Sequence, residues 1–137
     1  MDQKLLFDKI SIKTSRLVTH QYSTSFSLGI RCLEKELRDP IYSIYGFVRF
    51  ADEIVDTFHD YNKNQLFEQF QKDSYAAIQD KISLNPILNS FQSVVNHYKI
   101  EQELIDQFLK SMEMDLTQKS HDENSFNDYV LGSAEVV

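Results

Sequence analysis

One stretch of the chain carries acidic side chains at a spacing suited to binding a cation. At about 100° per helical residue, Arg49, Asp52 and Asp56 all fall within about 40° of Tyr45, and Glu53 lies beside this stripe. Carboxylates one helical turn apart repel each other unless positive charge lies between them. Hard divalent cations such as Mg²⁺ accept carboxylate and phosphate oxygens together, and an arginine can bind phosphate through two parallel hydrogen bonds. The stripe therefore predicts a site for Mg²⁺ and a diphosphate.

The surroundings of the stripe favour such a site over a row of ion pairs on a solvated helix. The Asp-x-x-x-Asp spacing alone is equally typical of both. The opposite side of the same helix, however, is apolar: Phe47, Phe50, Ala51, Ile54 and Phe58. A helix that is apolar almost all round is normally buried, so a narrow polar stripe on it indicates a functional groove.

Apolar residues at helical spacing run through most of the sequence, and this pattern gives the elements that must hold the stripe in place. It predicts helices over residues 3–20, 26–33, 41–58, 61–82, 87–98 and 101–116. A final helix is expected from Phe126, after a polar loop at 119–124. Pro40 is expected in the first turn of the 41–58 helix, where its missing N–H costs nothing. The predicted fold class is all-α, with no linker that divides residues 1–137.

Composition excludes several classes of protein. Fourteen Lys and Arg against twenty-one Asp and Glu give a net charge of −7, which speaks against a nucleic-acid binder. The single cysteine, Cys32, cannot form an internal disulfide, and no apolar run approaches the roughly 18 residues of a membrane span. The four histidines have no His or Cys partner three or four residues away, so no zinc site is predicted. These features indicate a cytoplasmic helical protein.

The stripe and three other segments resemble a known family. Residues 45–56, Y-G-F-V-R-F-A-D-E-I-V-D, resemble the first aspartate-rich helix of the squalene and phytoene synthases, which are head-to-head trans-prenyl synthases of the class I isoprenoid fold. Residues 20–26 are similar to the family's Ser-x-Ser-Phe segment, and residues 112–116 to its Met-Asp-Leu stretch. Residues 128–134 resemble its Tyr-x-x-x-Val-Ala-Gly helix. The four matches follow the family's order and span nearly the whole chain.

The resemblance implies a role for each matched residue. Three acids would bind Mg²⁺, or Mn²⁺, that bridges a prenyl diphosphate: Asp52, Glu53 and Asp56. Three side chains would contact that diphosphate: Ser23, Tyr45 and Arg49. Phe26 would line the prenyl channel. Tyr129, together with Tyr45, would act near the ionising carbon.

The implied reaction is metal-assisted ionisation of one allylic diphosphate, followed by 1′-1 coupling to a second through a cyclopropyl intermediate. The substrates would be farnesyl or geranylgeranyl diphosphate, and NADPH would take part only if the product is of the squalene type. Because such products are oils, peripheral association with a membrane stays open. The sequence leaves open the prenyl chain length, the choice among phytoene, squalene and dehydrosqualene, and the oligomeric state.

Three departures from the family pattern leave alternatives open. Thr24 stands where a basic residue is common, and Ser133 and Glu135 stand where Val and Gly are usual. The family's second aspartate-rich motif is missing. The chain is therefore expected to be the N-terminal part of a synthase and to be inactive alone. A terpene cyclase or head-to-tail prenyl synthase, and a non-catalytic helical binding module, are the competing interpretations.

Overall fold

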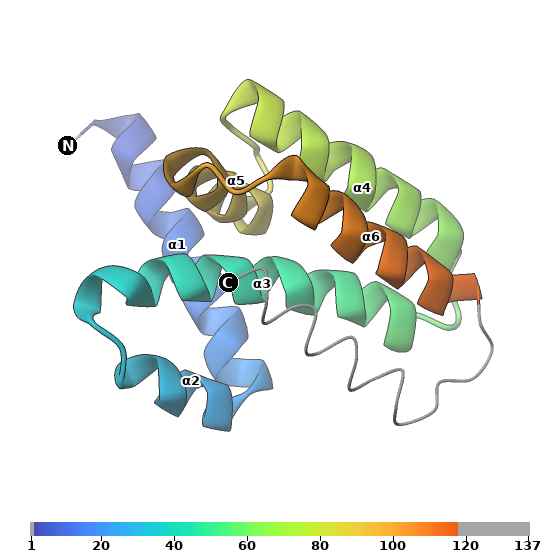
Figure 1. Ribbon diagram of the computed structural model, residues 1–137, viewed down its shortest axis with the longest axis horizontal. Coiled ribbons are helices and arrows are strands. Elements are labelled where there is room, and N and C mark those ends of the chain that lie inside the picture. The colour runs from blue at the N-terminus through green and yellow to red at the C-terminus, as the bar shows by residue number, and fades with distance from the viewer. Residues whose placement is uncertain (1, 118–137) are drawn as a thin grey trace.

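Six α-helices make up residues 2–117, the part of the chain that the computed structural model describes, and no strand occurs there (Figure 1). They are α1 (Gln3–Tyr22), α2 (Thr24–Arg31), α3 (Lys35–Asp56), α4 (Lys63–Asp80), α5 (Pro86–Tyr98) and α6 (Gln102–Thr117). The all-α fold class is confirmed. The loop predicted at 119–124 and the helix predicted from Phe126 lie outside the described residues.

Helix α3 starts earlier than predicted. It begins at Lys35, so Pro40 lies inside the helix, and the prediction that Pro40 occupies the first turn is wrong. The turn before α3 explains the early start, because the Arg38 guanidinium donates hydrogen bonds to the carbonyls of Leu33 and Arg31, at 3.2 and 3.1 Å. Pro40 therefore costs one backbone hydrogen bond near an exposed helix end, where water can replace it.

The core forms around the apolar side of α3. The Phe47 ring stacks on Phe91 of α5 with 3.8 Å between centroids, and its centroid lies 5.3 Å from Phe70 of α4 and 5.5 Å from Phe108 of α6. Ala51 is completely buried beneath these rings. This packing confirms the predicted apolar side of the helix, and it turns the polar stripe of α3 away from α4, α5 and α6.

Helix α1 packs through small hydroxyl side chains, although its sequence also offers large apolar residues. Ser11, Ser15 and Thr19, four residues apart, are fully buried, whereas Leu5, Ile10 and Leu17 are about half exposed. The Ser11 and Thr19 hydroxyls donate to carbonyls one turn earlier, each at 2.9 Å. Hydroxyls satisfied in this way can be buried at little cost, and their small size allows the helices to approach closely.

Ser15 packs against Gly46 of α3, and this contact gives a testable contrast between two helical glycines. A Cβ at Gly46 would lie 3.1 Å from the Ser15 Oγ, whereas a Cβ at Gly29 in α2 would meet nothing within 4 Å. Gly29→Ala should therefore stabilise the protein by about 0.5–1 kcal/mol, through helix propensity alone. Gly46→Ala should lose that gain and destabilise by about 1–2 kcal/mol through overpacking.

Urea unfolding of both variants measures this difference directly. An equal gain in the free energy of unfolding for the two alanines would show that α1 can move away from α3 without cost.

Candidate functional site

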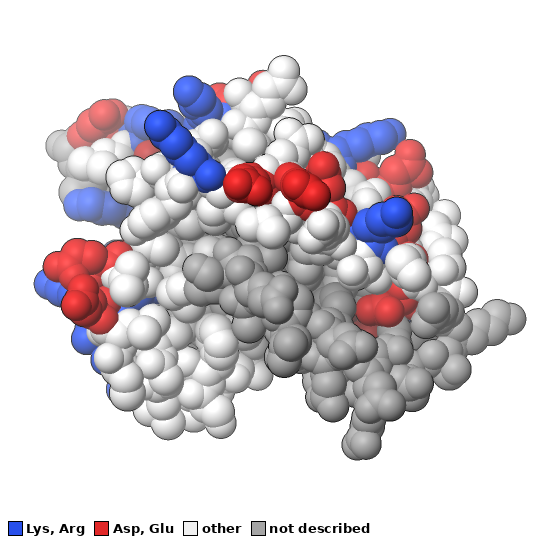
Figure 2. Space-filling model, viewed as in Figure 1, with Lys and Arg blue, Asp and Glu red and all other residues white. Residues whose placement is uncertain are grey.

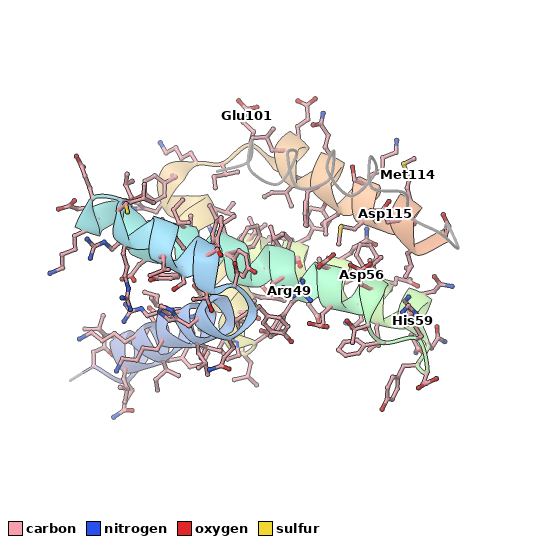
Figure 3. The ribbon with its side chains drawn as sticks, turned by 90° about the horizontal axis from the view of Figure 1, so that it is seen from below. Arg49, Asp56, His59, Glu101, Met114 and Asp115 are labelled. Carbon is pink, nitrogen blue, oxygen red and sulfur yellow. The ribbon has the colours of Figure 1, made fainter. Side chains whose placement is uncertain are left out.

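The polar stripe predicted on α3 forms as expected, with an arginine bridging two acids. Arg49 donates from Nη1 to Asp52 Oδ2 at 2.6 Å and from Nη2 to Glu53 Oε2 at 3.1 Å. The Asp52 and Glu53 side chains are only 14% and 13% exposed, so both ion pairs are shielded from solvent. Asp56 follows one turn after Asp52, at the exposed end of α3 (Figure 3). A buried fork of this kind holds its geometry more firmly than a surface pair does.

Asp52 and Asp56 form a close pair of carboxyl groups. Burial, together with a hydrogen bond and charge repulsion from Asp56, raises the pKa of Asp52 to about 7, although Arg49 acts in the opposite direction. Asp52 thus keeps its proton at a pH where isolated aspartates are ionised. A divalent cation can take the place of that proton, so the donor set fits Mg²⁺.

Glu53 has a different environment from the other two acids. Burial alone would raise its pKa, but hydrogen bonds from Thr57, Tyr22 and Arg49 bring the pKa below its ordinary value. Within residues 2–117 no three His, Cys, Asp or Glu side chains gather into a group that could hold a metal ion. As placed here, Glu53 serves as the counter-ion of Arg49. Its role as a third metal ligand stays a prediction.

The junction between α1 and α2 brings the other predicted residues to the same stripe. Ser23 ends α1 and caps α2, because its hydroxyl accepts a hydrogen bond from the Phe26 amide at 3.1 Å. The same side chain hydrogen-bonds with Tyr45, and burial raises the pKa of the Tyr45 phenol. The Phe26 ring stacks on Tyr45 with 4.8 Å between centroids. Ser23, Phe26 and Tyr45 therefore form one contact group next to Arg49.

Apolar surface continues from this group over α2. Phe26 and Leu28 are 42% and 56% exposed. Figure 2 shows this part of the surface, at the lower left, without charged side chains. The charged and aromatic components of the site thus lie side by side, as a ligand with an anionic head and an apolar chain requires.

Comparison with known protein families tests the resemblance seen in the sequence. The profile described as squalene/phytoene synthase matches residues 19–137, from the end of α1 onward. The chain belongs to the squalene/phytoene synthase family. Members of this family are transferases that act on prenyl diphosphates in head-to-head coupling. A search of curated proteins found no match.

Tyr22 is a residue of this squalene/phytoene synthase site that the sequence analysis missed. It lies within the matched residues 20–26, directly before Ser23 of the Ser-x-Ser-Phe motif. Its ring lies 4.5 Å from the guanidinium carbon of Arg49, and its phenol hydrogen-bonds to Glu53, which raises the pKa of Tyr22. The Tyr22 ring thus packs against the flat face of the Arg49 guanidinium, while Asp52 and Glu53 accept hydrogen bonds from its two Nη atoms. The signal available in the sequence was an aromatic residue at a helix end, which is too common to single out.

The segments matched to the squalene/phytoene synthases near the C-terminus are only partly described. Residues 112–116 form the last turns of α6: Met112 is buried in the core, and Met114 and Asp115 follow it alongside the part of α3 that carries Asp56 (Figure 3). Tyr129 and the rest of residues 128–134 lie outside the described residues, so the role predicted for Tyr129 stays a prediction. No helix among residues 2–117 is long and apolar enough to cross a membrane.

Proposed function

We propose that this chain supplies the first diphosphate-binding wall of an enzyme that joins two allylic prenyl diphosphates 1′-1. The product would be of the phytoene or squalene type. The observation that supports the proposal most is the alignment of the adjoining Asp52 and Asp56 carboxyl groups with the Arg49 fork on one narrow stripe. Family membership supplies the reaction class, and the stripe supplies residues suited to its charge.

Each residue of the stripe and of the adjoining α1–α2 junction then has a role in the proposed reaction. Arg49 binds the oxygens of the departing diphosphate, and Ser23 and Tyr45 orient it by hydrogen bonding. Phe26 covers the reacting end and keeps water from the allylic carbon. Mg²⁺ held by Asp52 and Asp56 would neutralise the negative charge that develops on the leaving group. The substrate would be farnesyl or geranylgeranyl diphosphate, which share the diphosphate end that these residues would bind.

Calorimetric titration with a non-hydrolysable farnesyl diphosphate analogue tests the proposal. Binding should require Mg²⁺ or Mn²⁺, and Asp52→Ala and Asp56→Ala should each weaken it by about tenfold or more, since one metal ligand is lost. Asp60→Ala, in the exposed loop after α3, is the matched control and should bind normally. Binding that ignores both the metal and the two α3 substitutions would contradict the proposal.

Mass spectrometry of products formed by the complete enzyme separates this reaction from that of a cyclase. Coupling 1′-1 doubles the number of prenyl carbons, whereas cyclisation leaves the number unchanged. A cyclised product of unchanged carbon count would refute the proposed reaction while leaving the diphosphate site intact.

A further inference from the structure

The outward face of α1 carries an apolar row that no described residue covers. Leu6, Ile10 and Leu17 fall within an arc of about 40° on this helix. Their side chains are 39%, 47% and 57% exposed. Single exposed leucines are ordinary, but three large apolar side chains on one helix face form a row, with Lys13 on the same face between Ile10 and Leu17.

Two lysines border this row without counter-ions. Lys9 and Lys13 lie within about 60° of Leu6 and are exposed. The other cations of α1 are paired, Lys4 with Asp8 at 2.7 Å and Arg16 with Asp39 at 2.9 Å. Neither Lys9 nor Lys13 makes an ion pair or a side-chain hydrogen bond to another residue in the range 2–117.

Helix α1 is a basic region of an otherwise acidic protein. It contains four Lys and Arg but a single Asp, whereas the whole chain has a net charge of −7. Other elements carry acids at the surface, as over α6 in Figure 2, where Glu103, Asp106 and Glu113 are exposed. The net negative charge of the whole chain would repel it from a negatively charged surface. The positive charge of α1 can still attract such a surface locally, and in one orientation of the protein.

The position of α1 leaves this face available. The helix packs on α2, α3 and α5 through the opposite side, which carries Ser11, Ser15 and Thr19 (Figure 1). Most of α1 also precedes residue 19, where the family match begins. The basic apolar face is thus a feature of this chain and lies outside the matched synthase segment.

We propose that the outward face of α1 binds the surface of an anionic membrane. Leu6, Ile10 and Leu17 would enter the boundary between headgroups and acyl chains, while Lys9 and Lys13 extend along it to lipid phosphates. Protein–protein interfaces are depleted in lysine, and a two-fold contact between copies would oppose like charges. A lipid surface is the occupant that accepts leucine and lysine together. This proposal goes beyond the prenyl transfer proposed above and does not depend on it.

Vesicle flotation tests the proposal directly. The purified protein should float with phosphatidylcholine vesicles that contain about 30 mol% phosphatidylglycerol, and it should stay unbound with phosphatidylcholine alone. Raising the salt to about 1 M should release most of it, because the lysine contacts are screened.

Three variants locate the contact. Lys9→Glu with Lys13→Glu should lower the partition coefficient by about tenfold, and Leu6→Gln with Leu17→Gln should lower it similarly at unchanged charge. Lys72→Glu with Lys110→Glu changes charge equally on α4 and α6 and should bind almost as the wild type does. Circular dichroism verifies folding, which these exposed positions should leave intact.

Three outcomes would overturn the proposal. The first is failure of the wild type to bind anionic vesicles, and the second is an equal loss in the α1 and control pairs. The third is a wild-type dimer in gel filtration that the α1 variants abolish, which would assign the face to a second copy. None of these outcomes bears on metal-dependent binding of the diphosphate analogue, so the two proposals fail separately.

Discussion

Asp52→Asn is expected to stabilise the metal-free protein near neutral pH and to abolish its stabilisation by Mg²⁺. In the unfolded chain Asp52 ionises near the ordinary pKa of 3.8, whereas burial and Asp56 raise the pKa of Asp52 to about 7 in the folded state. Between these two values the unfolded state loses its proton while the folded state keeps it. The folded state therefore becomes less stable as the pH rises, and it carries the full penalty above about pH 7.

Asparagine removes this penalty because it does not ionise. In EDTA at about pH 8 the variant should be more stable than the wild type by on the order of 2 kcal/mol, which corresponds to several degrees in Tm. At about pH 4 the two proteins should unfold at nearly the same temperature, because both carry a neutral group there. Added Mg²⁺ should raise the Tm of the wild type alone.

Thermal unfolding followed by circular dichroism gives the Tm of both proteins at the two pH values in EDTA, and again with Mg²⁺. Asp60→Asn, exposed after the end of α3, removes one acid from the same region and serves as the control. A loss of stability at both pH values in Asp52→Asn would show that the Arg49 ion pair outweighs the repulsion from Asp56, and it would contradict the expectation.

Arg49→Met is expected to have the largest destabilising effect of any substitution on the stripe. It leaves Asp52 and Glu53 without the cation between them, and both side chains are at most 14% exposed. Removing one partner of a buried ion pair strands the other charge. Because Arg49 lowers the pKa of Asp52, its loss leaves Asp52 protonated near neutral pH, and Glu53 is then the stranded charge, at a cost of about 2–4 kcal/mol. The stability of Arg49→Lys should lie between those of the wild type and Arg49→Met, because one ammonium group cannot replace both hydrogen bonds of the arginine fork.

Urea unfolding measures the effect, and Arg16→Met provides the comparison. Arg16 also pairs with an aspartate and also lies over a tyrosine ring, but its ion pair is about half exposed. Its loss should cost about 0.5 kcal/mol or less. Adding Glu53→Gln to Arg49→Met should restore part of the stability, since it removes the charge that the loss of Arg49 leaves unpaired. Equal costs at Arg16 and Arg49 would mean that burial of the fork contributes nothing.

The helices and the polar stripe could be predicted from the sequence because both follow from residue spacing. The apolar side of α3 turned out to be the side that packs on α4, α5 and α6, as its pattern indicated. Periodicity did not predict which face of α1 is buried, since hydroxyl side chains make that contact and the leucines face outward. Hydrophobic patterning cannot detect a helix that packs by close approach.

The start of α3 and the role of Tyr22 depend on contacts between separate elements. Pro40 was expected in the first turn of the helix, but α3 begins five residues earlier, at Lys35. The hydrogen bonds from Arg38 to the preceding turn stabilise this earlier start. Tyr22 reaches Arg49 only because α1 crosses α3 at that point. The structure does bring Ser23, Phe26 and Tyr45 together next to Arg49. Residues that act through contacts between separate elements, such as Tyr22, left no local signal in the sequence.

The serine interface of α1 has a geometric consequence for the site. Helix α1 packs against α3 where Ser15 faces Gly46, and two turns further on α1 ends at Tyr22, with Ser23 as its cap. Since Ser23 also caps α2, a rotation of α1 about this contact would shift Ser23 and Phe26 together relative to Arg49. One pair of small residues thereby helps to set the distance of Ser23 and Phe26 from Arg49. A larger side chain at Ser15 or Gly46 is expected to move Ser23 and Phe26 relative to Arg49.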